Sequence, residues 1–206
     1  MKNLLAVFLL SLLTLSFSCQ SGKETESKDT TEMEGGDMTG SDSSEDMTSS
    51  EAYTTTVLKS DIPSPRKEMK GSIGGATITV NYGSPSVKGR NLWGGLVPYD
   101  QVWRAGANEA TSIEVSKDIT LGDKTLAAGK YGFFLYPKED GAWEVIFNEV
   151  SDQWGAYDYD KSKDVARVMA TPTMVDDSSE TMDFMIEGNN LVLRWGKLKL
   201  PIAISA

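Results

Sequence analysis

The chain of 206 residues contains no histidine, and its only cysteine is Cys19. Without imidazole, the sequence lacks the commonest general base and the side chain on which most zinc, copper and non-haem iron sites depend. A single cysteine leaves no partner for a disulfide, so the folded part must be held by packing alone. We therefore expect no metal and no cofactor, and a protein that is more readily a binding or structural module than an enzyme.

Long apolar runs are confined to the N-terminus, where Lys2 precedes an apolar stretch over residues 4–15 and two small serines lie just before Cys19. The stretch is too short for a membrane span, which needs about 20 apolar residues. A basic start, a short apolar core and small residues are typical of a secretory signal peptide. With the cysteine at the cleavage site, the segment resembles a bacterial lipoprotein signal. The prediction is that residues 1–18 are removed, that Cys19 is lipidated, and that the protein is anchored to the cell envelope at the outer membrane. An ordinary signal peptide with an incidental cysteine is the alternative.

Residues 20–51 contain no Ile, Leu, Val, Phe, Tyr or Trp. Ten acids and two lysines, −10 + 2, give this stretch a net charge of −8. Such a segment cannot bury enough apolar surface to offset the entropy lost on ordering. We expect a disordered acidic linker over residues 19–52 that holds the following domain, residues 53–206, away from the membrane. An acidic tail that binds cations or a basic partner is the alternative.

The following domain carries little net charge. The total of −10, less −8 for the linker and +1 for Lys2, leaves −10 + 8 − 1 = −3 for residues 53–206. Because it has no basic stripe to neutralise phosphates, we expect no nucleic-acid partner.

Hydrophobic periodicity in residues 53–206 is mostly two, the period of strands. Residues 76–82 alternate with β-branched side chains, and 131–136 and 143–147 flank an Asp140–Gly141 turn. Further strands are predicted at residues 112–115, 165–170, 182–187, 191–195 and 198–204, with turns at residues 188–190 and at Gly196. Pro201 places the last strand at an edge or a bulge, and a short helix is expected near residues 158–163. The prediction is a single antiparallel all-β domain, a sandwich or jelly roll.

One long Gly- and Pro-rich segment, residues 82–111, concentrates aromatic, cationic and amide side chains. Such a loop on a rigid β scaffold is where binding sites usually lie. The candidate ligand-binding residues are Lys88, Arg90, Trp103, Arg104, Asn108 and Glu109. Arg104 and Glu109 lie close enough in sequence to form an ion pair. The alternative is a well-packed loop whose polar groups bind only one another.

The same segment contains motifs that are similar to those of a known protein family. Its motifs are Pro85–Arg90, Gly95–Tyr99 and Val102–Thr111, and the similarity continues through residues 126–131, 143–148 and 154–155. Over residues 62–204 the chain resembles domain of unknown function 2911, a family of exported bacterial proteins. The resemblance brings no assigned activity and no catalytic residues. The family's characteristic polar positions correspond to Lys88, Arg90, Arg104, Asn108 and Glu109.

Three further motifs give weaker evidence of a function. Ser64 and Lys67 match S-x-x-K, but the companion motifs of penicillin-recognising enzymes are absent. Residues 158–164 have acids at calcium-like spacing, but Ser162 replaces the third ligand, no glycine follows it, and two lysines oppose a cation. Trp154, Tyr157 and Tyr159 could stack on a sugar, although packing is the default for such a cluster.

Three functions remain open from the sequence. The first is an anchored β-sandwich module that binds a polar small molecule, a glycan or an envelope partner through the 82–111 loop. The second is a histidine-free hydrolase that uses Glu109 with Arg104. The third is a purely structural or interaction protein of the cell envelope. A cleft lined by the loop's polar residues would favour the first, and a second buried acid facing Glu109 would favour the second.

Overall fold

The computed structural model describes residues 52–206. The predicted signal peptide, the lipidation site Cys19 and all of the predicted linker but Ala52 lie outside the described residues. Among the described residues, no helix is long and apolar enough to cross a membrane.

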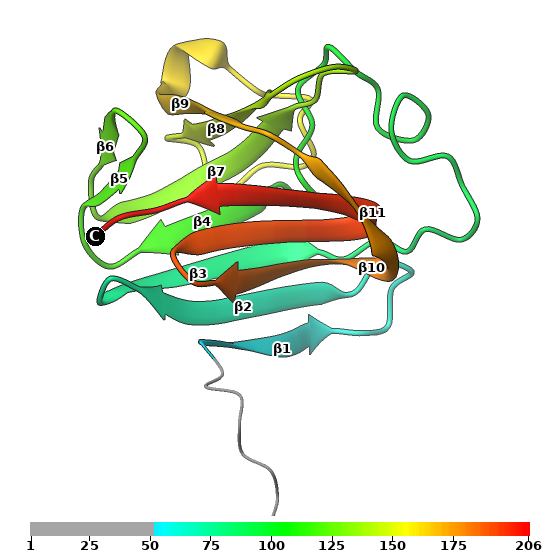
Figure 1. Ribbon diagram of the computed structural model, residues 1–206, viewed down its shortest axis with the longest axis horizontal. Helices are drawn as coiled ribbons and strands as arrows, with labels where there is room; N and C mark the ends of the chain where they lie inside the picture. The colour runs from blue at the N-terminus through cyan, green and yellow to red at the C-terminus, as the bar shows by residue number, and fades with distance from the viewer. Residues whose placement is uncertain (1–51) are drawn as a thin grey trace, which may run out of the picture. The chain divides into compact units, whose positions relative to one another are not determined.

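Seven antiparallel strands form the main sheet (Figure 1). They are β1 (Tyr53–Lys59), β2 (Arg66–Ile73), β3 (Ala76–Gly83), β4 (Thr111–Val115), β7 (Gly129–Tyr136), β8 (Trp143–Asn148) and β9 (Asp164–Ala170). Their order in the sheet follows the chain, and the small hairpin of β5 (Ile119–Leu121) and β6 (Lys124–Leu126) is inserted between β4 and β7. The sheet is therefore an antiparallel meander, in which strands consecutive in the chain lie side by side although some of their connections are long.

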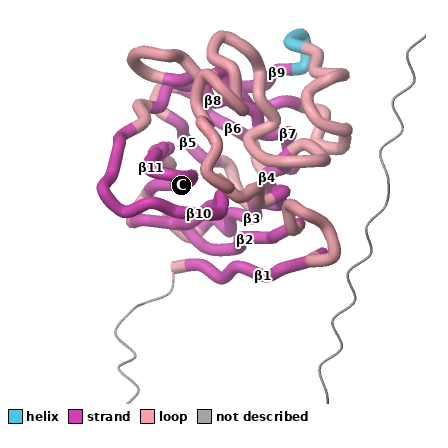
Figure 2. The backbone as a smooth tube through the Cα atoms, turned by 90° about the vertical axis from the view of Figure 1, so that its right-hand side faces the viewer, coloured by secondary structure: helices cyan, strands magenta, loops and turns pink. Residues whose placement is uncertain are grey.

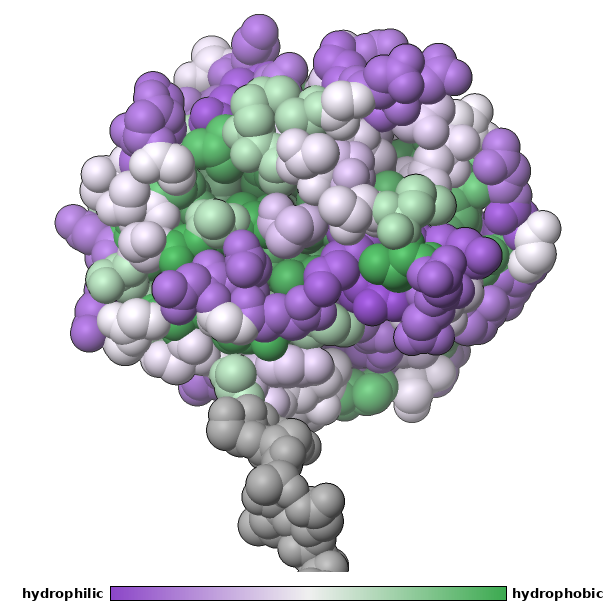
Figure 3. All heavy atoms as spheres, viewed as in Figure 1, coloured by the Kyte–Doolittle hydropathy of each residue, from purple (hydrophilic) through white to green (hydrophobic). Residues whose placement is uncertain are grey.

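A second layer is formed by the long hairpin of β10 (Thr173–Glu187) and β11 (Asn190–Ala203). Figure 1 shows this hairpin crossing in front of the middle strands of the main sheet. Phe133 of β7 faces the hairpin and packs against Phe184 of β10, with ring centroids 5.7 Å apart. The main hydrophobic core joins the buried residues of the sheet to those of the hairpin. On the surface of the same face, hydrophilic and hydrophobic residues are interspersed (Figure 3).

The other face of the sheet is covered by loops. Phe134 alternates with Phe133 along β7 and so points to the opposite side, where it packs with Ile146 and Ala110 in a separate small cluster. Tyr159, which is partly buried, completes this cluster from the loop after β8. Figure 2 looks onto the end of the molecule where several of the long loops gather.

The all-β antiparallel sandwich predicted from the sequence is confirmed. The predicted strands over residues 76–82, 112–115, 131–136, 143–147 and 165–170 correspond to β3, β4, β7, β8 and β9. The turn predicted at Gly196 is wrong, because β11 runs through it without interruption. Gly196 has φ of 57° and pairs with Ser179 where the register shifts, so it marks a bulge in a continuous strand. The helix expected near residues 158–163 is reduced to one 3₁₀ turn, η1 (Lys161–Lys163).

Candidate functional site

The loop between β3 and β4, residues 84–110, leaves the sheet and returns to the neighbouring strand. Its first residues pair with β10: the Ser84 hydroxyl donates to the Met182 carbonyl at 2.7 Å, and the Val87 N–H donates to the Glu180 carbonyl at 2.8 Å. The start of the loop thus follows the edge of the hairpin, which fixes its direction relative to the second layer.

The later part of the loop is held against β7 and β3. Trp103 and Leu135 exchange two backbone hydrogen bonds of 2.7 and 2.9 Å. The loop also approaches β3 closely at Gly83, where a Cβ atom would lie 2.1 Å from the carbonyl oxygen of Ala107. Only glycine permits this approach, so the return path of the loop depends on that residue.

Backbone strain is concentrated in this loop. Within the part of the chain that the structure describes, the non-glycine residues with positive φ are Lys88, Asp100, Ala105 and Asn108, and all four belong to the loop. Each such conformation costs on the order of 1–3 kcal/mol and persists only where the surroundings impose it. Two of the four, Ala105 and Asn108, lie one and four positions after Arg104, so the backbone is strained next to this arginine.

A cavity of about 540 Å³ opens between this loop, the segment after β8 and strand β11. Its lining comprises Ser64, Pro85, Arg90, Leu96, Val97, Pro98, Gln101, Val102, Trp103, Arg104, Gly106, Ala107, Ala156, Tyr157 and Trp195. Two of these residues are cationic, and none of the described residues that line the cavity is acidic. The volume is within the range of about 300–1,000 Å³ usual for small-molecule sites.

Arg104 is the unusual member of this lining. Its Nε is buried without a hydrogen-bond partner among residues 52–206. Burial lowers the pKa of Arg104, and Tyr157 opposes this only in part. Its own carbonyl accepts a hydrogen bond from the Thr111 N–H at 3.2 Å, so the backbone acceptor is satisfied while the side-chain Nε is not. A desolvated cation without a counter-charge favours an anion at the same place.

Arg90 lies at the exposed rim and is held by its own loop. Its Nε donates to the Val87 carbonyl at 3.1 Å, and its Nη2 donates to the Ser86 carbonyl at 2.5 Å. These bonds fix the position of the positive charge but use part of the guanidinium's donor capacity.

Trp103 forms the floor of the cavity. It is 8% exposed and stacks on Trp195 of β11 with ring centroids 6.0 Å apart and an interplanar angle of 14°. Trp93 meets both rings edge-on, at 5.8 Å each. The Nε1 of Trp195 is a second buried donor without an acceptor in the described part of the chain. The floor is therefore rigid, aromatic and incompletely satisfied in its hydrogen bonds.

The other three sequence-predicted residues lie outside the cavity lining. Lys88 is exposed, and its N–H donates to the Glu180 carboxylate at 2.9 Å. Asn108 has a structural role, since its carbonyl accepts the Gly155 N–H at 3.1 Å. Glu109 is exposed as well and forms an isolated β-bridge with Trp154.

The ion pair that the sequence allows between Arg104 and Glu109 does not form among the described residues. Glu109 instead lies 3.8 Å from Arg66, with 51% of its side chain exposed. It lines a separate depression of about 330 Å³, in which the other acid is Asp152. Asp152 is exposed, so within residues 52–206 this depression offers no buried acid opposite Glu109.

Two residues of the cavity were missed by the sequence analysis. Trp195 was assigned only to a strand, and Tyr157 was assigned to a packed aromatic cluster. That packing is correct for Tyr159, whose ring lies 5.2 Å from that of Phe134. It is wrong for Trp154 and Tyr157, which are 59% and 85% exposed. The glycine between them, Gly155, was the sequence signal for a turn at this point. In the structure it has φ of 68°, and both rings lie outside the packed cluster.

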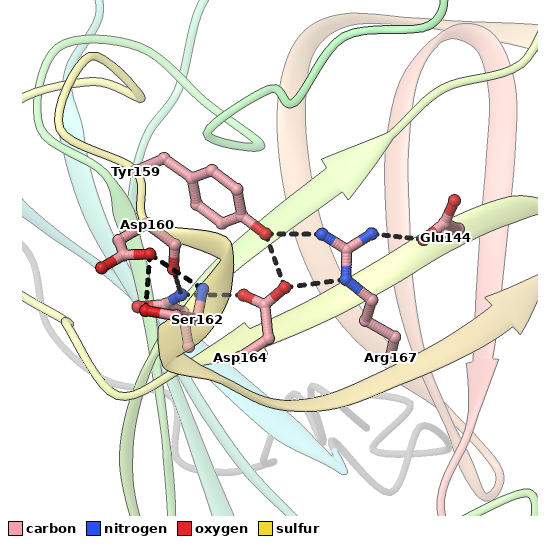
Figure 4. A network of polar contacts seen from close by, with 7 residues as sticks. Glu144, Tyr159, Asp160, Ser162, Asp164 and Arg167 are labelled. Carbon is pink, nitrogen blue, oxygen red and sulfur yellow. Dashed lines mark hydrogen bonds and ion pairs between the residues drawn. The ribbon is translucent and has the colours of Figure 1, made fainter.

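Two of the acids at calcium-like spacing, Asp160 and Asp164, form hydrogen bonds with neighbouring side chains (Figure 4). Asp164 accepts hydrogen bonds from Arg167, Tyr159 and Asn148 at 2.6–2.8 Å. Asp160 caps η1 by accepting from Ser162, which lowers the pKa of that carboxyl. No group of three or more potential metal-binding side chains occurs among the residues described.

Comparison with known proteins places the chain in a family. The family model described as "Protein of unknown function (DUF2911)" matches residues 64–204. The chain belongs to this family. No curated protein and no solved structure matches it. The DUF2911 match spans the 84–110 loop, the segment after β8 and strand β11, and thus every residue that lines the cavity.

Proposed function

We propose that the DUF2911 domain binds a small polar ligand in the cavity lined by Arg90, Trp103 and Arg104. The observation that carries this proposal is the half-buried guanidinium of Arg104, whose buried Nε has no hydrogen-bond partner among the described residues. Natural proteins rarely leave a buried donor unsatisfied without a functional reason. The same cavity has a rigid aromatic floor and a strained loop wall, as binding sites often do.

We also propose that the protein is exported and anchored to the outer membrane by a lipid. Residues 1–18 act as a lipoprotein signal, Cys19 carries the lipid, and the acidic segment that follows lets the domain reach ligands away from the outer membrane. Mass spectrometry of the mature product would check this, with Cys19→Ser as the variant that loses the lipid. An unmodified N-terminus in the wild-type protein would contradict the anchor but would leave the cavity proposal standing.

The binding proposal is tested by thermal unfolding of the full-length chain in mild detergent against a panel of sugars, carboxylic acids and short peptides. Gln101→Trp adds bulk at an exposed position of the lining and should abolish any ligand-dependent rise in melting temperature. Asp123→Trp adds the same bulk at an exposed site in the β5–β6 turn and should leave the rise intact. A rise that persists in Gln101→Trp would place the ligand elsewhere.

The hydrolase alternative is weaker. Retaining and inverting glycosidases need two carboxylates within about 5–10 Å of one another. Glu109 is paired with Arg66 and faces no buried acid in the described region, and Arg104 lies in a different cavity. Turnover of a glycoside or ester probe that is lost in Glu109→Gln would revive this alternative.

A further inference from the structure

The charge of the cavity lining is opposite to that of the domain. Residues 52–206 carry 17 basic and 20 acidic side chains, 17 − 20 = −3, yet the acidic residues of the described chain are absent from the cavity lining while two arginines are present. A lining of one sign raises the local concentration of ligands with the opposite charge. The ligand is therefore expected to be an anion.

The number of free donors limits the charge of that anion. Arg90 already gives two hydrogen bonds to its own loop, to Val87 and Ser86. No hydrogen bond joins the Arg104 guanidinium to another described residue, and its Nε is buried. The fork available to a ligand is therefore the pair of terminal nitrogens, which matches the two oxygens of a carboxylate. One uncommitted guanidinium neutralises one negative charge, which favours a carboxylate over a phosphate dianion.

The aromatic rings at the mouth indicate what the carboxylate is attached to. Tyr157 lines the cavity with 85% of its surface exposed, and Trp154 lies two positions earlier with 59% exposed. A Cβ atom on Gly155 would lie 3.1 Å from the Tyr157 ring and 3.9 Å from Cδ of Arg104, so the ring and the arginine flank the same glycine. The face of an aromatic ring is electron-rich and attracts the polarised C–H groups on one side of a sugar ring.

We propose that the ligand of this cavity is a sugar that carries a carboxylate, such as a uronic acid at the end of a glycan. Its carboxylate is bound by the Arg104 fork with the charge of Arg90 at the rim, and its ring stacks on Tyr157. A peptide or amino acid would satisfy Arg104 but would leave the exposed aromatic face without a role. This assignment rests on the proposed function, since it names the ligand of the same cavity.

The test is isothermal titration calorimetry of the full-length chain in mild detergent. The probes are glucuronate and galacturonate, their neutral counterparts glucose and galactose, and acetate as a carboxylate without a sugar. We expect at least one uronate to bind at least about tenfold more tightly than the neutral sugars and acetate. Equal affinity for neutral sugars, or for acetate, would overturn the assignment.

Variants separate the two parts of the proposed site. Arg104→Gln should weaken uronate binding about tenfold to 100-fold, because a hydrogen-bonded ionic pair is lost. Tyr157→Ala should weaken it about threefold to tenfold, and since this side chain is largely exposed the variant will fold. Lys124→Gln removes an equal charge in the β5–β6 hairpin, outside the cavity lining, and should change nothing. Uronate binding that survives both Arg104→Gln and Tyr157→Ala would overturn the proposal.

Different results would contradict the binding cavity and the assignment of a carboxylated sugar as its ligand. If no uronate binds but another ligand of the panel raises the melting temperature and Gln101→Trp abolishes that rise, the carboxylated sugar is wrong and the binding cavity stands. If nothing in the panel binds, both are wrong.

Discussion

Two arginines of this domain lie in contrasting surroundings. Arg167 of β9 donates to Asp164 at 2.7 Å, to the Tyr159 hydroxyl at 2.6 Å and to Glu144 at 2.5 Å (Figure 4). Arg104 is half-buried like Arg167, yet its Nε has no hydrogen-bond partner among residues 52–206.

The pKa values of the two guanidinium groups reflect this difference. Burial alone would lower the pKa of Arg167, but hydrogen bonds to Asp164 and Glu144 outweigh it and raise the pKa above its ordinary value. At Arg104 burial prevails and the pKa falls. A partly buried arginine with a full set of acceptors stabilises the fold, whereas one without acceptors is available to a ligand.

The largest expected effect comes from breaking the satisfied cluster. Arg167→Met should lower the free energy of unfolding by about 2–3 kcal/mol, because Asp164, whose side chain is 8% exposed, is left as an uncompensated buried charge. Urea denaturation would measure it. The double variant Arg167→Met with Asp164→Asn should recover part of the loss, and no recovery would show that the charge is not the cause.

A second prediction concerns how the cavity loop is held. Gly83→Ala should cost about 1–3 kcal/mol, because its Cβ would collide with the Ala107 carbonyl. Gly89→Ala, in the same loop but with open space around its Cβ and φ of 66°, should cost only about 1 kcal/mol. Equal losses in urea denaturation would mean that close approach does not anchor the loop.

The third prediction sharpens the comparison at Arg104. Arg104→Met should change the free energy of unfolding by less than about 1 kcal/mol in either direction, because no acidic partner is left behind. The same substitution at Arg167 serves as the matched reference. A loss at Arg104 as large as that at Arg167 would contradict the view that this guanidinium is kept for a ligand.

The smallest expected effect is that of pH near neutrality. With no histidine in the chain, stability should be nearly constant from about pH 6 to 9. Burial raises the pKa of Tyr82 and of Tyr159, and Asp183 and Asp164 respectively add to this. Because both tyrosines hold their protons more tightly when folded, stability is full below about pH 10, the unfolded pKa, and is lost as pH rises above it.

Urea midpoints measured across that pH range would check this. Tyr159→Phe should flatten the alkaline decline, since the variant has no hydroxyl to titrate at that position. A slope between pH 6 and 8 would mean that some other group in the chain titrates with an unusual pKa.

Much of the sheet could be predicted, because β3 buries alternate side chains and because β4, β7 and β8 bury short runs of apolar residues next to turn signals. Strands β1 and β2 were missed for a physical reason. β1 lies at the edge of the sheet with six of its seven residues exposed, and β2 buries only Met69 and Ile73 fully. Gly196 was misassigned because positive φ serves a turn and a bulge equally.

Composition singled out the loop that lines the cavity, and three of its six candidate residues, Arg90, Trp103 and Arg104, lie in that lining; whether they bind a ligand stays a prediction. Spacing along the chain could not show that Glu109 faces away from Arg104. Nor could it supply Tyr157 and Trp195, which come from distant segments and reach the cavity only through the loop after β8 and the β10–β11 hairpin.

The route of the chain between β3 and β4 has a consequence for changes within the loop itself. The two strands are neighbours in the sheet, yet residues 84–110 make a long excursion between them. Because lengthening a loop whose ends are already adjacent adds little entropic cost, residues can be inserted in this excursion while the strand pairing is preserved. The sheet thus tolerates insertions here, whereas the shape of the proposed site depends on the contacts of the loop at Gly83 and Trp103.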